Sequence, residues 1–524
     1  MRRVCLSFLL AVIAPVVAAA VDGVPLQETL TPGLQRALAV GDSPAQAADG
    51  TLAVWVHFTD KGVDGPALAA ALQRTEDGLG ERARKRRAKV AADKDGRLVD
   101  ATDLPLHRPY TAAVAATGAV PRRESRWLNA ASFDATPAQI RTLAAMPFVR
   151  RVELVRHSRR SPLPAVPAPA GGGFRAGKAT TALDYGGSLA ELEQINVTAV
   201  HDAGWHGQGV LIGMLDTGFS VLHEALAAVN VIDAWDFVNN DGVVDNETGD
   251  PSSARNHGTM TLSTVGGYNP GTLVGPAYGA SFVLAKTEDV ADELPVEEDN
   301  WVAGIEWLDT FGIDVASSSL GYYDWYVFDD LDGATAPCTI AADLAVAKGI
   351  VVGNSAGNER ANAWGHIIAP ADGDSVITTG AVDPDGNLTY FSSPGPTADG
   401  RTKPDVSARG QGNHVASPSD PAAYLSVSGT SFSCPLTSGV AALVLSRVPQ
   451  LTPMQVREAL RMTASRAGTP DNDLGWGLLD AWAAVHYFGA SITHEPIGDI
   501  EDTVGPYTLT ATITDREALD PAGL

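Results

Sequence analysis

Residues 209–215 read GVLIGML, and Asp216 follows this run directly. A short apolar run of this kind indicates a strand that is buried on both faces of a sheet. Similar runs recur further along the chain, at 281–285, 315–319, 350–353 and 376–380. Helical stretches such as 299–311 and 340–348 lie between them. This alternation predicts an α/β domain with a doubly wound, mostly parallel sheet over residues 186–487.

A smaller α+β domain is predicted over residues 21–160. Thr136 followed by Pro137 is typical of a helix start, so a helix is expected over 137–145. The basic run RARKRRAK at 82–89 is interpreted as an exposed helix face rather than a nucleic-acid patch. Strands are expected at 51–58, 126–134 and 149–155, where alternating or β-branched residues gather.

The first twenty residues have the pattern of a secretory signal peptide. Arg2 and Arg3 precede an apolar run, and the small residues 18–20 offer a cleavage site. A short buried helix is the alternative. We therefore expect residues 1–20 to direct export, to the extracellular space or the periplasm.

Two further segments are expected to lie outside the compact domains. Residues 161–185 begin with a run of Pro, Ala and Gly, which predicts an exposed linker that is open to proteolysis. Residues 488–524 form a C-terminal extension. Within it, the alternating strand at 506–515 indicates either a short tail or the start of a truncated β-sandwich domain.

Charge is divided unevenly along the chain. Residues 1–180 hold 25 Lys and Arg against 16 Asp and Glu, whereas the remainder holds 12 against 46. This split predicts electrostatic docking of the front half on the back half, although acidity can also simply keep an exported protein soluble. It argues against nucleic-acid binding. Cys338 and Cys434 are expected to be two separate buried thiols, with a single bridge as the alternative.

Four polar residues stand beside the predicted buried elements. Asp216 ends a strand, His257 begins a helix of small residues, and Asn358 follows another strand. Ser431 precedes a long run of small and apolar residues, at the expected start of a buried helix, where free backbone N–H groups could stabilise an oxyanion. Taken singly, each could be a cap or turn residue.

Taken together, these segments resemble the motifs of the subtilase family of serine endopeptidases. The order of Asp216, His257 and Ser431 is the subtilisin order. The matching segments are Leu215–Gly218, His257–Thr259, Ser355–Asn358, Phe391–Pro396, Lys403–Asp405, Gly429–Pro435 and Gly475–Gly477. The resemblance covers residues 186–487.

The resemblance implies a role for each residue of the site. Ser431 would be the nucleophile, His257 the general base and acid, and Asp216 the residue that orients the imidazole. Asn358 would complete the oxyanion hole. Two segments would bind substrate: Ser319, Leu320 and Gly321 as an edge strand, and Ser355, Ala356 and Gly357 as the other wall of the first specificity pocket. These small wall residues suggest room for an apolar or aromatic side chain.

Residues 21–160 resemble the inhibitor-type propeptide that precedes many subtilases. The resemblance therefore implies a zymogen whose propeptide acts as chaperone and inhibitor. Two positions depart from the family pattern: Met260 stands where a second histidine is usual, and Arg409 where proline is usual. No cofactor is expected for catalysis. The acid-rich segment 236–250 leaves structural calcium open, but a solvated acidic loop is the favoured interpretation.

The sequence thus predicts a secreted, monomeric serine endopeptidase that acts on proteins and peptides, with no transmembrane segment. Two alternatives remain at this point. A catalytically inactive binding module would lack some of the four site residues, which are all present. An unrelated α/β hydrolase acting on esters would carry a G-x-S-x-G elbow and the order Ser-Asp-His, and both are absent.

Overall fold

The structure is a computed structural model. It describes residues 29–39, 47, 49–91, 96–155, 183–290, 298–323 and 326–489, and the backbone of 491–494 and 511–514. The predicted signal peptide and all but the last three residues of the predicted linker lie outside the described residues. So does most of the predicted strand at 506–515. Its described part, β17 (Ala511–Thr514), pairs antiparallel with β16 (Ser491–His494).

The large domain is built on a seven-stranded sheet in which every neighbouring pair is parallel, as the sequence predicts. The strand order is β13-β12-β11-β10-β5-β9-β6. The strands are β5 (Leu211–Asp216), β6 (Asn230–Asp236), β9 (Ser281–Lys286), β10 (Val315–Ser318), β11 (Val351–Ser355), β12 (Ile377–Val382) and β13 (Val406–Arg409).

The position of β5 in this order explains where a site can form. The chain leaves β5 for β6 and β9 on one side and later builds β10 to β13 on the other. The strand order therefore reverses at β5, and in open α/β sheets ligands bind at the carboxyl ends of the strands beside such a reversal. Asp216 is the last residue of β5.

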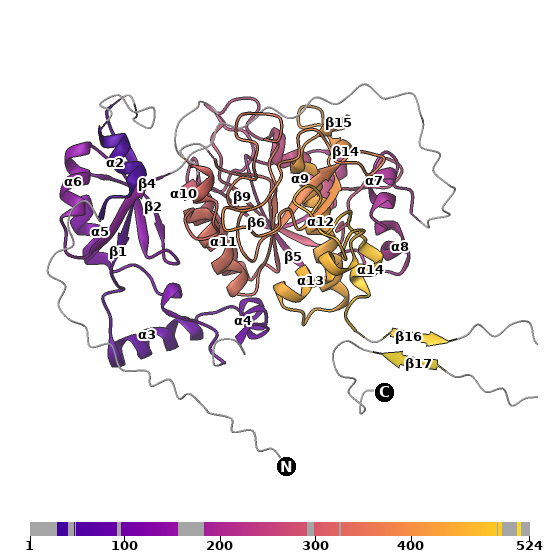
Figure 1. Cartoon of the computed structure of the whole chain (residues 1–524), viewed down its shortest axis with the longest axis horizontal. Coiled ribbons are helices and arrows are strands. Elements are labelled where there is room, and N and C mark those ends of the chain that lie inside the picture. Colours follow the sequence, from indigo (N-terminus) through magenta and orange to yellow (C-terminus); the bar gives the residue numbers. More distant parts are fainter. Residues whose placement is uncertain are drawn as a thin grey trace, which may run out of the picture.

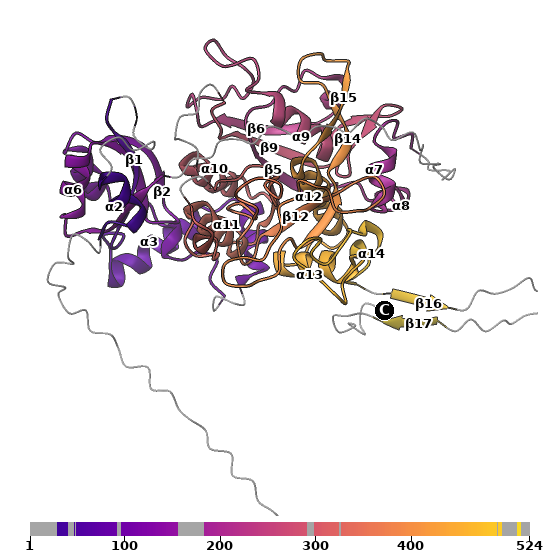
Figure 2. The same ribbon diagram turned by 45° about the horizontal axis from the view of Figure 1, so that its top comes forward.

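Helices cover both faces of the sheet (Figures 1 and 2). Alternate residues of β5 point to opposite faces, so Ile212 packs into one apolar cluster and Leu215 into the other. The helices that contribute to the first cluster are α7 (Leu189–Gln194), α8 (Val197–Asp202), α9 (Asn256–Gly266), α12 (Thr430–Arg447), α13 (Pro453–Thr463) and α14 (Ala481–Val485). Those of the second are α10 (Glu298–Phe311) and α11 (Pro337–Ala347). A hairpin of β14 (Gln411–Ala416) and β15 (Tyr424–Ser428) adjoins α9.

The small N-terminal domain has an antiparallel sheet of order β2-β3-β1-β4. Its strands are β1 (Leu52–Phe58), β2 (Val120–Ser125), β3 (Ala130–Ala135) and β4 (Val149–Leu154), and its helices are α2 (Pro32–Ala39), α3 (Gly65–Asp77), α4 (Glu81–Ala88), α5 (Arg108–Ala115) and α6 (Pro137–Ala144). Thr136 caps α6 in a capping box. The predicted strand at 126–134 begins only at Ala130, because 126–129 form a turn, and β2 was not predicted.

One face of this small sheet packs on the large domain. Val54 and Val56 lie in the domain's own core, whereas Ala53 and Trp55, on the opposite face, share an apolar cluster with α10 and α11. Figure 1 shows the small domain, drawn in indigo and purple, beside these two helices. The two domains are therefore held together partly by apolar burial.

The basic run at 82–89 corrects one prediction. It forms most of α4, but this is not simply an exposed face, since Arg86 and Arg87 are only 1% and 3% exposed. Both guanidinium groups pair with Asp309 on α10, and Arg87 also pairs with Asp103 at 3.0 Å. Arginine can be buried where carboxylates satisfy its fork of donors, and sequence alone did not reveal these distant carboxylates.

The predicted docking of a basic front half on an acidic back half is visible in further ion pairs. Arg122 Nε lies 2.9 Å from Asp299 Oδ2, and Arg126 Nη2 lies 3.1 Å from Asp309 Oδ2. Asp299 and Asp309 both belong to α10. This helix is therefore the principal electrostatic contact for the small domain.

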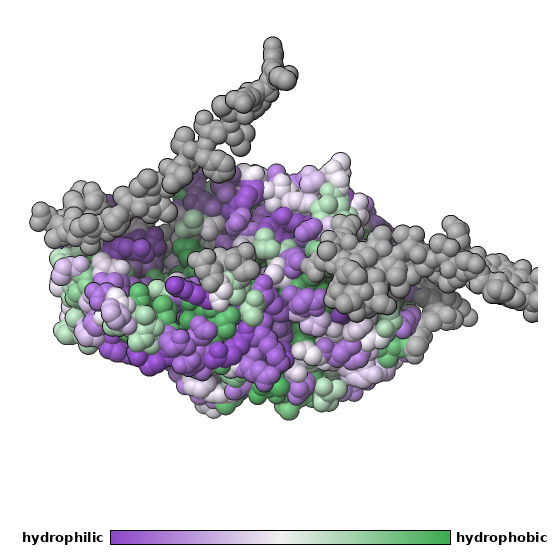
Figure 3. All heavy atoms as spheres, turned by 90° about the horizontal axis from the view of Figure 1, so that it is seen from below, coloured by the Kyte–Doolittle hydropathy of each residue, from purple (hydrophilic) through white to green (hydrophobic). Residues whose placement is uncertain are grey.

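Other general predictions can also be compared with the described residues. Cys338 and Cys434 are both buried and free, as expected. None of the described helices combines the length and the apolar character needed to cross a membrane. Hydrophilic residues cover much of the face shown in Figure 3.

Candidate active site

Asp216 and His257 form the best-defined contact of the site. Asp216 is fully buried at the end of β5, and His257 is the second residue of α9. Asp216 Oδ1 lies 2.7 Å from His257 Nδ1. Because a carboxylate can only accept, Nδ1 carries the proton, and Nε2 of the neutral ring is left with a lone pair. The contact thus sets the tautomer that a general base requires.

One hydroxyl and one backbone N–H hold the carboxylate of Asp216 in place. Thr261 Oγ1 donates to Asp216 Oδ2 at 2.8 Å, and the backbone N–H of Thr217 donates to Oδ1 at 2.7 Å. Sequence reasoning did not identify Thr261. A signal was present, because Thr261 lies four residues after His257 and therefore on the same face of α9.

Ser431 lies in the first turn of α12 and is 6% exposed. Pro435 cannot donate the helical hydrogen bond to the carbonyl of Ser431, because proline has no N–H. Ser319 Oγ donates to this carbonyl instead, at 2.9 Å. The ring of Phe432 lies 6.1 Å from that of His257, so the starts of α9 and α12 are close together.

Thr430, the residue before Ser431, holds Asn358 near the start of α12. Its Oδ1 accepts hydrogen bonds from the backbone N–H and the hydroxyl of Thr430, at 2.9 and 3.1 Å. An N–H can only donate, so these bonds fix which end of the amide faces Thr430. These bonds use the oxygen of the amide and hold Asn358 next to Thr430, the residue before Ser431. Thr430 is a second positioning residue that sequence reasoning missed.

The two predicted substrate-binding segments lie side by side. β10 and β11 pair in register from Val315–Val351 to Ser318–Asn354, and the segments 319–321 and 355–357 lie at their carboxyl ends. Asn354 Nδ2 donates to the carbonyl of Leu320 at 3.0 Å, which ties one segment to the other. The structure therefore brings all the predicted site residues to one edge of the sheet, next to the reversal of strand order.

Comparison with known proteins agrees with this geometry. Residues 207–477 match the model of the subtilase family, and residues 53–166 match that of the peptidase S8 propeptide domain of Bacteroidota. The chain belongs to the subtilase family. Subtilases are serine endopeptidases, so this chain is one, and its small domain is a propeptide.

Several subtilisins are similar to the large domain of this subtilase. The chain is 33% identical to subtilisin DY of Bacillus licheniformis, over 55% of this chain and 96% of that protein. It is 32% identical to subtilisin E of Bacillus subtilis, over 56% of this chain and 70% of that protein. The structure is similar in fold to fervidolysin from Fervidobacterium pennivorans, with a TM-score of 0.59 and 22% identity over 86% of this chain and 64% of the other.

Catalysis by subtilisins needs no cofactor, but many bind structural calcium. Within the described residues, one group of carboxylates could hold a metal ion: Asp236, Asp241 and Glu247, whose ligand atoms lie within 4.8 Å of one another. In this subtilase the positively charged side chain of Lys286 lies beside this group. Lys286 Nζ lies 2.7 Å from Asp236 Oδ2 and 2.8 Å from Asp250 Oδ2.

The lysine makes this loop a poor match for calcium. Burial lowers the pKa of Lys286, but the hydrogen bonds and charges of Asp236 and Asp250 outweigh this effect and raise it, so the ammonium stays charged. Asp236, the last residue of β6, is fully buried, whereas the other acidic residues of the segment are partly exposed, as a solvated acidic loop predicts. The lysine thus already neutralises one of the three carboxylates, Asp236, whereas Asp241 and Glu247 have no ion pair with it.

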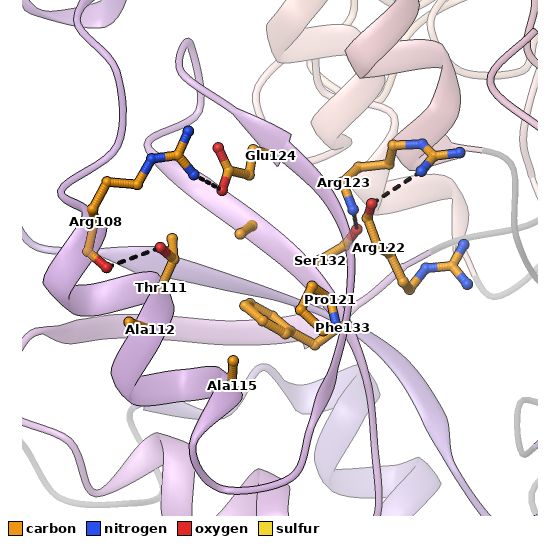
Figure 4. A pocket seen from close by; sticks show the side chains of 11 residues that line it. Arg108, Thr111, Ala112, Ala115, Pro121, Arg122, Arg123, Glu124, Ser132 and Phe133 are labelled. Atoms are coloured by element: carbon orange, nitrogen blue, oxygen red, sulfur yellow. Dashed lines mark hydrogen bonds and ion pairs between the residues drawn. The ribbon is translucent and has the colours of Figure 1, made fainter. Parts of the chain in front are cut away.

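A hollow of about 570 Å³ opens in the propeptide between α5 and the strands β2 and β3 (Figure 4). Arg108 Nη1 and Glu124 Oε1 form an ion pair of 2.7 Å across it. Arg122 and Arg123, on β2, also line the hollow, and their side chains bond Asp299 and Asn300 of α10. Since all of its lining residues fall between 108 and 133, the hollow belongs to the propeptide and not to the catalytic centre.

Proposed function

We propose that this subtilase is an exported endopeptidase, made as a zymogen, that cleaves peptide bonds through an acyl-enzyme on Ser431. The observation that supports this best is the 2.7 Å contact of Asp216 with His257 at the start of α9, beside the start of α12 that carries Ser431. The base and its orienting carboxylate are thus in contact, and the proposed nucleophile lies at the start of the neighbouring helix.

In the first step, Ser431 Oγ would attack the carbonyl carbon of the substrate while its proton moves to His257 Nε2. Asp216 would stabilise the resulting imidazolium through its contact with Nδ1. The oxyanion would be held by Asn358 Nδ2 and the backbone N–H of Ser431, near the positive end of α12. His257 would then protonate the leaving amine as the C–N bond breaks, which leaves the acyl group on Ser431.

Water completes the reaction by the same residues in reverse. His257 Nε2 would take a proton from water, whose oxygen attacks the acyl carbon, and would return the proton to Ser431 Oγ as the ester bond breaks. The products are a carboxylic acid and the free enzyme. Every proton in these steps is carried by His257.

Substrate would bind as an extended strand beside residues 319–321. Backbone hydrogen bonds provide most of the affinity in this kind of recognition, so we infer broad specificity. The segment 355–357 would form the other wall of the pocket for the side chain that precedes the cleaved bond. From these small wall residues alone, an apolar or aromatic side chain is favoured there.

The propeptide would block this cleft until it is cleaved. Its last described residue, Val155, belongs to the same apolar cluster as Leu320 of the predicted edge strand. The end of the described propeptide is therefore packed on the domain that carries the proposed substrate site. Export by the segment 1–20 and cleavage in the segment 161–185 are parts of the same proposal. We propose a monomer for the mature enzyme.

The decisive experiment is the substitution Ser431→Ala in the full-length chain. We expect it to abolish both casein hydrolysis and removal of the propeptide, with a fall in kcat of about a millionfold for any peptide substrate. Ser252→Ala, at an exposed position in the same domain, is the matched control and should behave as wild type. If purified Ser431→Ala still removes its own propeptide, the assignment of the nucleophile is wrong.

A further inference from the structure

Ile368 lies between the two walls of the predicted first specificity pocket. A Cβ atom added at Gly321 would stand 2.3 Å from Ile368 Cδ1, and one added at Gly357 would stand 3.1 Å from the same atom. A real Cβ almost never comes as close as the first distance. The side chain of Ile368 thus fills the space that both glycines leave open.

The backbone fixes Ile368 in this position. The next residue, Ala369, exchanges two hydrogen bonds with Tyr322, of 2.8 and 3.0 Å, directly after the segment 319–321. On the other side, Gly357 has a φ of +103°, where a side chain would be strained. Ile368 therefore contacts Gly321 and Gly357, two positions at which a larger residue would clash or be strained.

Core packing alone does not account for this side chain. Among the described residues, the neighbouring Ile367 is fully buried within the apolar cluster that includes α10 and α11, and Ile368 is not part of that cluster. Ile368 keeps 7% of its surface exposed. Its side chain stands between the segments 319–321 and 355–357, and the second of these leads directly to Asn358.

We propose that Ile368 forms the floor of the first specificity pocket and restricts the side chain before the cleaved bond to small residues such as alanine. This rests on the proposed function and sharpens it, because the small wall residues by themselves suggest an apolar or aromatic preference. An isoleucine between the walls removes the depth that a benzyl group needs. A methyl group requires no such depth and still gains apolar contact.

The test is a comparison of two tetrapeptide amide substrates that differ only in having alanine or phenylalanine before the cleaved bond. For the mature wild-type enzyme, kcat/KM should favour alanine by at least about tenfold, since even one methylene that fits or clashes changes the rate by about 10- to 200-fold. Ile368→Ala should shift the ratio towards phenylalanine by a factor in that range. Ile368→Val should shift it in the same direction by less.

Ile232→Ala is the matched control, because Ile232 is 52% exposed on β6 and its loss should leave the ratio unchanged. A wild-type preference for phenylalanine, or an unchanged ratio in both Ile368 variants, would overturn the proposal while leaving the peptidase function intact. If Ile368→Ala does not mature, the wild-type ratio and the Val variant decide. Failure of the wild type to cleave either substrate, or casein, would instead refute the proposed function and this inference with it.

Discussion

The catalytic centre and the contact between propeptide and α10 are built from different kinds of residue. The centre uses one carboxylate, one imidazole and small polar side chains at the starts of two helices. The contact uses arginines of the propeptide against carboxylates of a single helix, with Arg86, Arg87 and Arg126 all directed at Asp309. Each region is largely buried, but only the second is dense in charge.

This difference suits the two regions, because one is permanent and the other is temporary. The centre must persist, and its hydrogen bonds are enclosed by α9, α12 and the sheet. Under the proposed maturation, the contact with the propeptide comes apart after cleavage. Charged groups such as Asp299 and Asp309 are well hydrated once exposed, whereas a contact that was apolar throughout would leave a larger hydrophobic patch on the mature enzyme than the cluster around Trp55 does. Ion pairs thus give a contact that is specific and still separable.

The comparison can be tested first at the catalytic centre, where the expected effect on activity is largest. Replacing Asn358 by alanine should lower kcat by about 100- to 1,000-fold and change KM little, because the lost donor acts on the oxyanion and not on the bound substrate. Steady-state kinetics on a peptide substrate measure both constants. Asn387→Ala, at an exposed position in the turn after β12, is the control. If KM instead rises by a similar factor while kcat is unchanged, Asn358 binds the substrate rather than the oxyanion.

The second test removes the charge at the centre of the propeptide contact. Burial raises the pKa of Asp309, but the charges of Arg86, Arg87 and Arg126 outweigh this effect and lower it, so the carboxylate is ionised. Asp309→Asn would leave these arginines without their shared partner and should destabilise the uncleaved Ser431→Ala chain by about 3–5 kcal/mol. Denaturant unfolding measures this change.

Asp374→Asn provides the control for that experiment, because the side chain of Asp374 is 76% exposed and its ion pair with Arg401 is 3.7 Å long. We expect a change of less than about 1 kcal/mol there. Equal effects of the two substitutions would contradict the view that the α10 contact is the stronger one.

The smallest effect is expected from pH. Glu306 accepts hydrogen bonds from Ser125, Arg126 and Trp127, and burial raises its pKa to about 7. A carboxyl whose pKa is higher in the folded chain binds its proton more tightly there. Its contribution is therefore fully present below its ordinary pKa of 4.5, and is lost as the pH rises through about 7. The expected span is at most about 3 kcal/mol.

We expect the uncleaved Ser431→Ala chain to lose stability between about pH 5 and pH 8, and Glu306→Gln to flatten this profile. Thermal unfolding at several pH values would measure it. Glu81→Gln is the control, since the side chain of Glu81 is 81% exposed. If the profile of the Glu306 variant keeps the wild-type slope, another group carries the pH dependence.

The residues proposed for the centre could be named from sequence because each belongs to a short motif with a local physical reason. An acid after an apolar run, a serine before a run of small residues and an asparagine after a strand can each be recognised within a short window. The parallel sheet was predicted for the same reason. The ion pairs of Lys286 with Asp236 and Asp250 were not predicted, because Lys286 comes from β9, a separate strand further along the chain.

The sequence by itself determined the parallel α/β fold and the alternation of strand and helix, and it singled out Asp216, His257, Asn358 and Ser431 as the proposed site. Only the tertiary structure decided which partners hold them: Thr261 on Asp216, Thr430 on Asn358 and Ser319 on the carbonyl of Ser431. It also decided that Arg86 and Arg87 are buried and that Ile368 stands between two glycines. Periodicity and motifs are properties of neighbouring residues, whereas burial and pairing depend on segments that meet only when the chain folds.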